Sequence, residues 1–380
     1  MEKLKMSKIK LLIIEDDKKA IENYKDTIVR MNRTSDDYRY YFAKNLEEAN
    51  EHIEYYKLDS AIVDLNLSGE NNDLKNDDGN EVIDKLIKSF RIPIFVVSGE
   101  PQKLAEKYKK NNLVSLITRG DKTTHDILIS IKENYNSPTI QYFSRNGFLE
   151  TKINDFYWTN LQHTLNSWNK VAIENPDEID KILSRHTVSC LNEQLYVNGN
   201  IGSFDKYHPG EMYINPPIKE HYHTGDIIEK DTEKFIILNP ACDIVNVGNL
   251  EFYLVSKLIT VENLKDISDN IKPDAQNPSL YENLNKKGKQ KFDHYKHNKS
   301  QRYHFLPQFD IIENNYVIDF QNLKTIKIGN IQEDGNYLEE REFYIKEYKK
   351  LASISSPFLK DVIVRFSSLY SRQGQPNLLN

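Results

Sequence analysis

The sequence contains little cysteine and no long apolar stretch. Cys190 and Cys242 are its only cysteines, which argues against a disulfide framework and favours a cytoplasmic location. No window approaches the roughly eighteen uninterrupted apolar residues that a membrane-spanning helix needs. The first residues, Met1–Lys5, lead straight into an apolar strand and lack the layout of a secretory signal peptide. We therefore expect no membrane association.

The chain also lacks an excess of basic residues. Its formal net charge is -6, so we do not expect a nucleic-acid partner, whose binding would depend on phosphate contacts. Internal repeats and low-complexity tracts are missing as well. What is present is a composition of 38% hydrophobic and 28% charged residues over 380 positions, which is typical of a globular protein with two or three domains.

Four apolar runs in the first third of the chain each end in a polar or charged side chain. The runs cover Ile9–Ile14, Ser60–Val63, Ile92–Val97 and Leu113–Thr118. The residues that follow them are Glu15 and Asp16, Asp64, Ser98, and Arg119, respectively. Runs of this kind predict buried parallel strands, and open α/β sheets place their chemistry at the carboxyl ends of such strands. We therefore expect these side chains to share one edge of a sheet.

Helical patterns alternate with these strands. A helix is expected after a cap at Asp17, a further strand at Tyr38–Ala43, and helices at Leu46–Tyr56, Gln102–Lys110 and Thr124–Asn134, with another around Val82–Ile87. Five strand–helix units in a row predict an α/β fold, a five-stranded doubly wound parallel sheet, over residues 1–138.

This arrangement resembles the receiver domain of bacterial response regulators, which work in two-component signalling. The resemblance implies that Asp64 is the phosphoacceptor, that Ser98 is the hydroxyl that contacts the phosphoryl group, and that the chain is a phosphoprotein. Glu15 and Asp16 would join Asp64 in the Mg²⁺ site, because phosphorylation of a carboxylate needs a cation that neutralises the phosphoryl oxygens. The implied partner is a cognate kinase or another partner protein.

Three positions depart from the family pattern. Arg119-Gly120 replaces the usual Lys-Pro, and Leu116 stands where the family carries an aromatic residue. The loop after Asp64 is also longer than usual. Arginine keeps the positive charge but presents a planar fork instead of a point charge. Two interpretations therefore remain open, an active phosphoacceptor and a degenerate receiver that serves as a rigid docking module.

A helical connector is expected over residues 139–192, after the Asn136-Ser137-Pro138 boundary. Asp155–Trp168 has aromatic side chains at helical spacing, which we expect to lie in a core or against another domain. Asp177–Leu191 is a second candidate helix.

The remainder, residues 193–380, predicts an α+β domain with a small bent sheet or an SH3-like barrel. Expected strands include 194–197, 211–214, 252–255, 258–261, 316–320 and 325–328, together with a hairpin formed by 224–228 and 235–238. Helices are expected at Glu339–Ala352 and Pro357–Tyr370. The segment Lys286–Arg302 is rich in lysine and aromatic residues, and we interpret it as a solvated segment instead of a nucleic-acid surface.

The phrase Pro240-Ala241-Cys242-Asp243-Ile244 resembles a Pro-x-Cys-Asp-Ile motif of uncharacterised bacterial proteins, some of them from phage-defence neighbourhoods. We expect Cys242 to be buried in a strand-end turn. His221, His223, His186 and Cys190 lack the close spacing of a structural zinc site, so zinc is not expected.

The sequence therefore indicates a response-regulator-like signalling protein whose receiver controls a binding or output domain. Beyond phosphoryl acceptance on Asp64, no enzymatic activity is expected. The alternative is a receiver-controlled effector enzyme such as a nuclease, for which acids and lysines gathered at strand ends of the second domain would be evidence. Only Asp226, Asp243 and Asp319 stand beside apolar runs there. The oligomeric state is left open.

Overall fold

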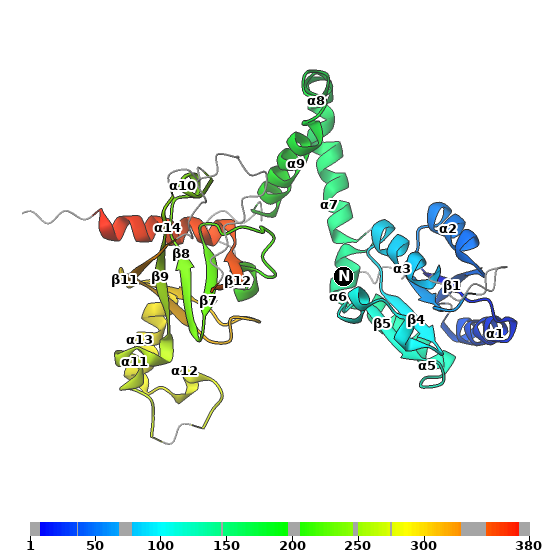
Figure 1. Cartoon of the computed structure of the whole chain (residues 1–380), viewed down its shortest axis with the longest axis horizontal. Helices are drawn as coiled ribbons and strands as arrows, with labels where there is room; N and C mark the ends of the chain where they lie inside the picture. Colours follow the sequence, from blue (N-terminus) through cyan, green and yellow to red (C-terminus); the bar gives the residue numbers. More distant parts are fainter. Residues whose placement is uncertain are drawn as a thin grey trace, which may run out of the picture. The chain divides into compact units, whose positions relative to one another are not determined.

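The computed structural model describes residues 8–35, 37–67, 78–145, 147–196, 206–245, 250–273, 276–327 and 347–371. The chain divides into two compact units, Met1–Ile201 and Gly202–Asn380 (Figure 1). Most of the loop after Asp64 lies outside the described residues. The domain boundaries at 138 and 192 stay a prediction.

The first unit contains the predicted parallel sheet. Its strands are β1 (Ile9–Ile14), β2 (Tyr38–Ala43), β3 (Ser60–Val63), β4 (Ile94–Ser98) and β5 (Val114–Thr118). The order is β2-β1-β3-β4-β5 and every pair is parallel. This is the order of flavodoxin-like doubly wound sheets, in which the strand order reverses beside the first strand and leaves a crevice at the carboxyl edge.

Helices cover both faces of this sheet. They are α1 (Lys18–Ser35), α2 (Leu46–Tyr55), α3 (Asp78–Ser89), α4 (Glu106–Lys109) and α5 (Thr124–Tyr135). One apolar cluster lies on the side of α2 and α3, and a second lies on the side of α1 and α5. Asp17 caps α1 as predicted, since its Oδ1 accepts from the amides of Lys19 and Ala20 at 2.7 and 3.0 Å. The helix predicted at Gln102–Lys110 is a 3₁₀ turn, Pro101–Lys103, followed by the single turn of α4.

A set of helices continues the first unit. It comprises α6 (Pro138–Phe143), α7 (Phe148–Phe156), a π-helical turn (Tyr157–Leu161), α8 (Gln162–Glu174) and α9 (Ile179–Tyr196). The two predicted helices are present. The strand predicted from Gln194 is wrong over Gln194–Tyr196, because α9 runs on through these residues. Each residue added to an existing helix gains a hydrogen bond without a new nucleation cost. This gain outweighs the weak strand preference of three residues.

The second unit is built on an open antiparallel sheet. Its strands are β6 (Tyr213–Ile214), β7 (Asp226–Lys230), β8 (Glu233–Ile237), β9 (Phe252–Thr260), β10 (Tyr303–Leu306), β11 (Tyr316–Lys327) and β12 (Lys349–Ile354). The order is β10-β11-β9-β8-β7-β12-β6. Because β10 and β6 form the two edges, the described strands make the bent-sheet alternative. The register of β11 on β9 shifts between Ile318 and Leu323, where a bulge bends the strand.

Some elements of this unit differ from the prediction. The runs 252–255 and 258–261, expected as two strands, form the single strand β9. Lys349–Ala352 was expected to be helical but lies in β12, where it pairs with β7 and buries Leu351 and Ala352. Its charged neighbours hid this short buried stretch. The part of that predicted helix at residues 339–346 lies outside the described residues.

Helices cover the second sheet. Helix α14 (Ser356–Tyr370) is the helix predicted near the end of the chain, and it packs beside the sheet through Val362. Shorter helices are α10 (Ala241–Val245), α11 (Lys265–Ser268), α12 (Leu280–Asn283) and α13 (Lys286–Lys296). Among the helices that the structure describes, none combines the length and the apolar character that crossing a membrane requires.

Candidate phosphoacceptor site

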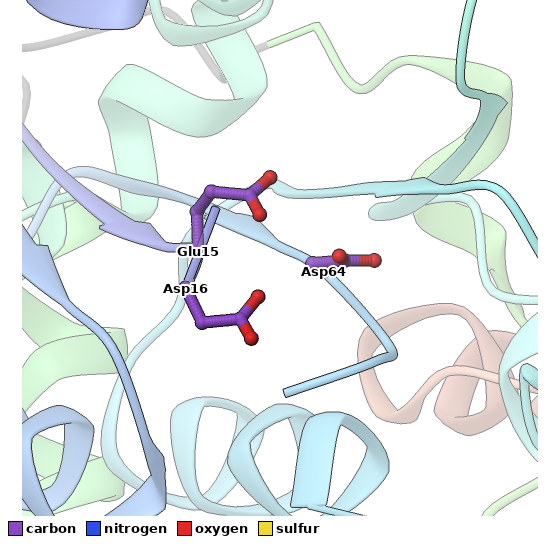
Figure 2. Close-up of side chains that lie close together, drawn as sticks. All are labelled: Glu15, Asp16 and Asp64. Atoms are coloured by element: carbon purple, nitrogen blue, oxygen red, sulfur yellow. The ribbon is translucent and has the colours of Figure 1, made fainter. Parts of the chain in front are cut away.

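Three carboxylates meet at the carboxyl edge of the parallel sheet, as the strand ends predicted. The pairing of Ile14 with Val63 places the next residues side by side, and the Asp64 amide donates to the Ile14 carbonyl at 3.0 Å. One ligand atom each from Glu15, Asp16 and Asp64 lies within 4.8 Å of the others (Figure 2). Glu15 and Asp64 are 3% and 6% exposed. Two of the three acids are therefore almost removed from water.

Arg119 bridges the two buried acids. Its Nη2 lies 2.8 Å from Glu15 Oε2 and 2.8 Å from Asp64 Oδ2. The backbone holds the residue in place, because the Arg119 amide donates to the Ser98 carbonyl at 2.9 Å. Gly120 follows with a φ of 103°, which a proline, fixed near -65°, could not adopt. The Arg-Gly pair thus gives the loop after β5 a backbone path that Lys-Pro would not allow.

Burial sets the acidity of this site. It raises the pKa of Glu15 and of Asp64, and the Arg119 guanidinium opposes both shifts. The amide of Asn66 and the Ser98 hydroxyl also lower the pKa of Asp64 by hydrogen bonding. Desolvation is the largest cause for both acids, and repulsion by Asp64 adds to the rise in the pKa of Glu15.

The donor set suits a hard divalent cation. All three groups offer carboxylate oxygens, which Mg²⁺ prefers together with water. With three carboxylates and one guanidinium, the formal charge of the cluster is about -2 when all are ionised, which one divalent cation would balance. Glu15 is also oriented in advance, since its Oε1 accepts from the Asp17 amide at 3.1 Å. The residues present therefore fit Mg²⁺.

A polar bridge that the sequence did not reveal lies beside Asp64. Lys103 Nζ is 2.9 Å from Asn66 Oδ1 and 2.7 Å from Glu100 Oε2, and the Asn66 amide group donates to Glu100. Asn66 and Glu100 stand two residues after Asp64 and Ser98. This position, close to two strand ends, was the sequence signal that could have predicted the bridge. The bridge joins the segments that follow β3 and β4.

The position of Leu116 agrees with its departure from the family pattern. Leu116 lies on β5 and its side chain is 40% exposed. At this position the chain therefore has an aliphatic side chain on the surface in place of an aromatic ring.

In the second unit, Asp226 anchors a hydrogen-bonded network. Its carboxylate accepts from Ser353 Oγ at 2.6 Å and from the His223 amide at 2.7 Å, and it pairs with Lys350 Nζ at 2.9 Å. Lys350 also donates to the carbonyls of Lys219 and His221 at 2.7 and 2.8 Å. These contacts occupy both groups in holding the 219–223 segment to the sheet. The acid–lysine pair therefore does not favour the effector-enzyme alternative.

Replacement of Asp226 by alanine should destabilise the second unit by about 3 kcal/mol, because it leaves the Lys350 ammonium buried without a counter-charge. Urea denaturation of the full chain checks this value. Asp243→Ala, at an exposed acid on α10, is the matched control and should change little. A stable Asp226→Ala protein would show that the network is not structural and would return Asp226 to the candidates for catalysis.

Among the residues that the structure describes, the histidines and cysteines do not gather into a metal site. Cys242 is exposed in α10, so the predicted buried turn is wrong; its Sγ donates to Asp243 Oδ1 at 3.5 Å. Cys190 Sγ lies 3.6 Å from a ring nitrogen of His186. Across the described ranges, the group of three acids around Asp64 is the one set of three or more side chains arranged to hold a metal.

The lysine-rich segment at Lys286–Arg302 is mostly helix α13. Phe292 and Tyr295, the aromatic residues that could stack on bases, are buried. Lys289 pairs with Glu282 at 3.0 Å, and Arg302 binds Asp319 through two hydrogen bonds of 2.7 and 2.6 Å. The aromatic component of a single-strand binding surface is therefore not accessible here.

Comparisons with known proteins concern the fold of about one third of the chain. No family model matches, and no curated protein matches. A CheY-like response regulator receiver domain from Methanospirillum hungatei JF-1 is 20% identical, with a TM-score of 0.26; the match covers 34% of this chain and 95% of that one. A response regulator from Thermotoga maritima is 16% identical, with a TM-score of 0.26 and coverage of 34% and 100%. A CheY-like receiver domain from Methylobacillus flagellatus is 19% identical, with a TM-score of 0.26 and coverage of 33% and 99%.

The fold of the first unit can be assigned from the strand order of its sheet, independently of these matches. The order β2-β1-β3-β4-β5 with alternating helices is the flavodoxin-like order that CheY also has. The first unit thus has a receiver-like fold, and the second is a separate antiparallel-sheet unit.

Proposed function

We propose that the chain is a response-regulator-like signalling protein in which the first unit accepts a phosphoryl group on Asp64 and thereby controls the second. The observation that carries the proposal is the placement of Asp64. It is 6% exposed, lies at the carboxyl edge of the sheet beside two further acids, and contacts a cation and a hydroxyl from the next two strands. The partner would be a cognate kinase or another phosphodonor protein.

The proposed reaction is the transfer of a phosphoryl group to the Asp64 carboxylate, with an acyl phosphate as the product. A carboxylate oxygen of Asp64 attacks the phosphorus of the donor, the bond from phosphorus to the donor's oxygen or nitrogen breaks, and the leaving group takes that electron pair. Glu15, Asp16 and Asp64 would hold Mg²⁺, which supplies charge neutralisation for the phosphoryl oxygens. The Ser98 hydroxyl and the Arg119 guanidinium, which both interact with Asp64, would donate hydrogen bonds to the product.

Mg²⁺ should stabilise the first unit by mass action, and the stabilisation should depend on Asp16. We expect millimolar Mg²⁺ to raise the melting temperature of the wild type and to leave Asp16→Asn unchanged. Asp17→Asn is the matched control, because Asp17 caps α1 and is not one of the clustered acids. A shift that persists in Asp16→Asn, or vanishes in Asp17→Asn as well, would argue against this metal site.

The competing function is a degenerate receiver that acts as a docking module. A specific observation favours it: Arg119 Nη2 already lies 2.8 Å from both Glu15 and Asp64, where it neutralises part of the charge that a metal would balance. In that case Asp64 is a structural acid and the unit binds its partner without phosphorylation. Under either function, we propose that the second unit is the output region. The role in phage defence also stays a proposal, and it depends on the Pro-x-Cys-Asp-Ile motif.

A further inference from the structure

The helices after the receiver-like sheet contain an uncharged surface. Residues 156–169 include no Lys, Arg, Asp or Glu, although 28% of the chain is charged. This stretch is largely exposed: Trp158 is 67%, Tyr157 41% and Leu165 41% exposed. A solvated helix normally carries charged side chains on its outer face. A stretch without charge is typical of the centre of a protein interface, where charged residues are depleted and aromatic residues enriched.

Contacts within the first unit leave this surface uncovered. Helix α9 packs against it from one side, where His186 lies 4.8 Å from the Trp168 ring and 6.2 Å from the Phe156 ring between centroids. Of the described side chains of α7, the π-helical turn, α8 and α9, Phe156 is the one that is fully buried. These helices therefore bury few side chains against one another. Helices with exposed apolar residues usually bury them by packing against further helices.

We propose that this surface, the hairpin face formed by Ile153, Tyr157, Trp158 and Leu165, packs against the same face of a second copy of the chain. The result is a symmetric dimer in which α7–α8 and α9 of each copy contribute to a four-helix arrangement. A π-helical turn, an arrangement often found at functional positions, carries Tyr157 and Trp158 at the centre of this face.

The charge pattern favours a second copy as the partner. A twofold axis brings identical residues near one another, so a charged face would meet like charge. Residues 156–169 have none, and the polar side chains among them are Thr, Asn, Gln, Ser and His, which both donate and accept hydrogen bonds. Lys152 and Asp155, on either side of Ile153, pair with each other at 3.8 Å and leave no net charge there. Such a face is complementary to itself. A partner with a charged surface would find no group of opposite charge on it.

The exposed area also fits a dimer. The four side chains of the hairpin face are 41% to 67% exposed, which leaves on the order of 400 Å² of mainly apolar surface per copy. A standard interface buries about 800 Å² per partner, of which slightly more than half is apolar. The hairpin face, together with the other uncharged residues of 156–169, thus supplies about the area that a stable dimer needs.

The test exploits the fact that Trp158 and Trp168, the chain's two tryptophans, both lie in these helices. We expect the full-length protein to sediment as a dimer and its tryptophan emission to shift to the blue as concentration rises, because association buries Trp158. Leu165→Glu keeps both tryptophans and should raise the dissociation constant at least 100-fold, with no blue shift. Trp158→Arg, followed by sedimentation alone, should act in the same direction.

Val364→Glu is the control, since Val364 is 62% exposed on α14 in the second unit. It should leave the dimer intact. Three results would overturn the proposal. One is a monomer at every concentration with red-shifted emission. Another is a monomer with blue, concentration-independent emission, which would mean that the chain's own second unit covers the face. The third is a dimer that Leu165→Glu and Trp158→Arg leave unchanged.

Discussion

Incubation with acetyl phosphate and Mg²⁺ is expected to add one phosphoryl group to the wild-type protein and none to Asp64→Asn. Asp64 is held by its own strand, its amide bonds to Ile14, and its side chain faces the guanidinium and hydroxyl that would bind the product. Because burial raises the pKa of Asp64, its carboxylate is more basic than an ordinary aspartate and a better nucleophile once ionised. Intact mass spectrometry measures the result directly.

The matched control for this experiment is Asp59→Asn. Asp59 precedes the same strand at its opposite end, its pKa is also raised by burial, and its carboxylate accepts from the Lys10 amide at 2.9 Å. Its replacement should leave the phosphoryl gain intact. Ser98→Ala should slow the gain about a hundredfold to a thousandfold if the hydroxyl stabilises the transferring group, as loss of one oxyanion-type donor does elsewhere. A wild type that binds Mg²⁺ yet gains no phosphoryl group would establish the degenerate receiver.

The parallel sheet and its acids could be predicted from sequence because two independent signals agree there. Near-continuous apolar runs such as Ile9–Ile14 are typical of strands that are covered on both faces, and a carboxylate directly after such a strand lies at the sheet edge. The gathering of Glu15, Asp16 and Asp64 follows from those two facts. The role of Arg119 as a bridge does not, because it depends on the reach of a long side chain across two strands.

The second unit was harder to predict because its strands are short and partly polar. The hairpin of β7 and β8 has a clear turn and was found. Strand β12 follows a charged segment, and its burial comes from pairing with β7, more than a hundred residues earlier in the chain. Long-range pairing of this kind leaves little trace in local periodicity. The exposed Trp158 shows the same limit, since helical spacing reveals a stripe but not whether anything covers it.

Arg119→Gln is expected to lower stability by about 2 kcal/mol at pH 8 without Mg²⁺, and by much less at pH 4. Removing the guanidinium leaves Glu15 and Asp64 buried without a counter-charge, which would ordinarily cost about 3–5 kcal/mol; the side chain of Arg119 is 41% exposed, so solvent reduces the effect. The pKa values of both acids, already raised by burial, should rise further in the variant.

The pH dependence of the Arg119→Gln effect follows from those raised values. At pH 4 the folded wild type and the folded variant both favour protonated Glu15 and Asp64, because burial raises both pKa values above the ordinary 4.5 and 3.8. Arg119 then has little negative charge to neutralise, so its loss costs little. As pH rises, the unfolded chain ionises first, and the variant loses stability until its folded acids ionise too. Because the competing cation is gone, Mg²⁺ should bind the variant about tenfold more tightly and restore most of the loss. Urea denaturation at pH 4 and 8, with Mg²⁺ or EDTA, measures the loss of stability and its rescue by Mg²⁺. Lys122→Gln, three residues along the same loop, controls for the loss of a nearby cation. An equal loss at both pH values, or a variant that Mg²⁺ does not rescue, would mean that Arg119 acts through packing instead of charge.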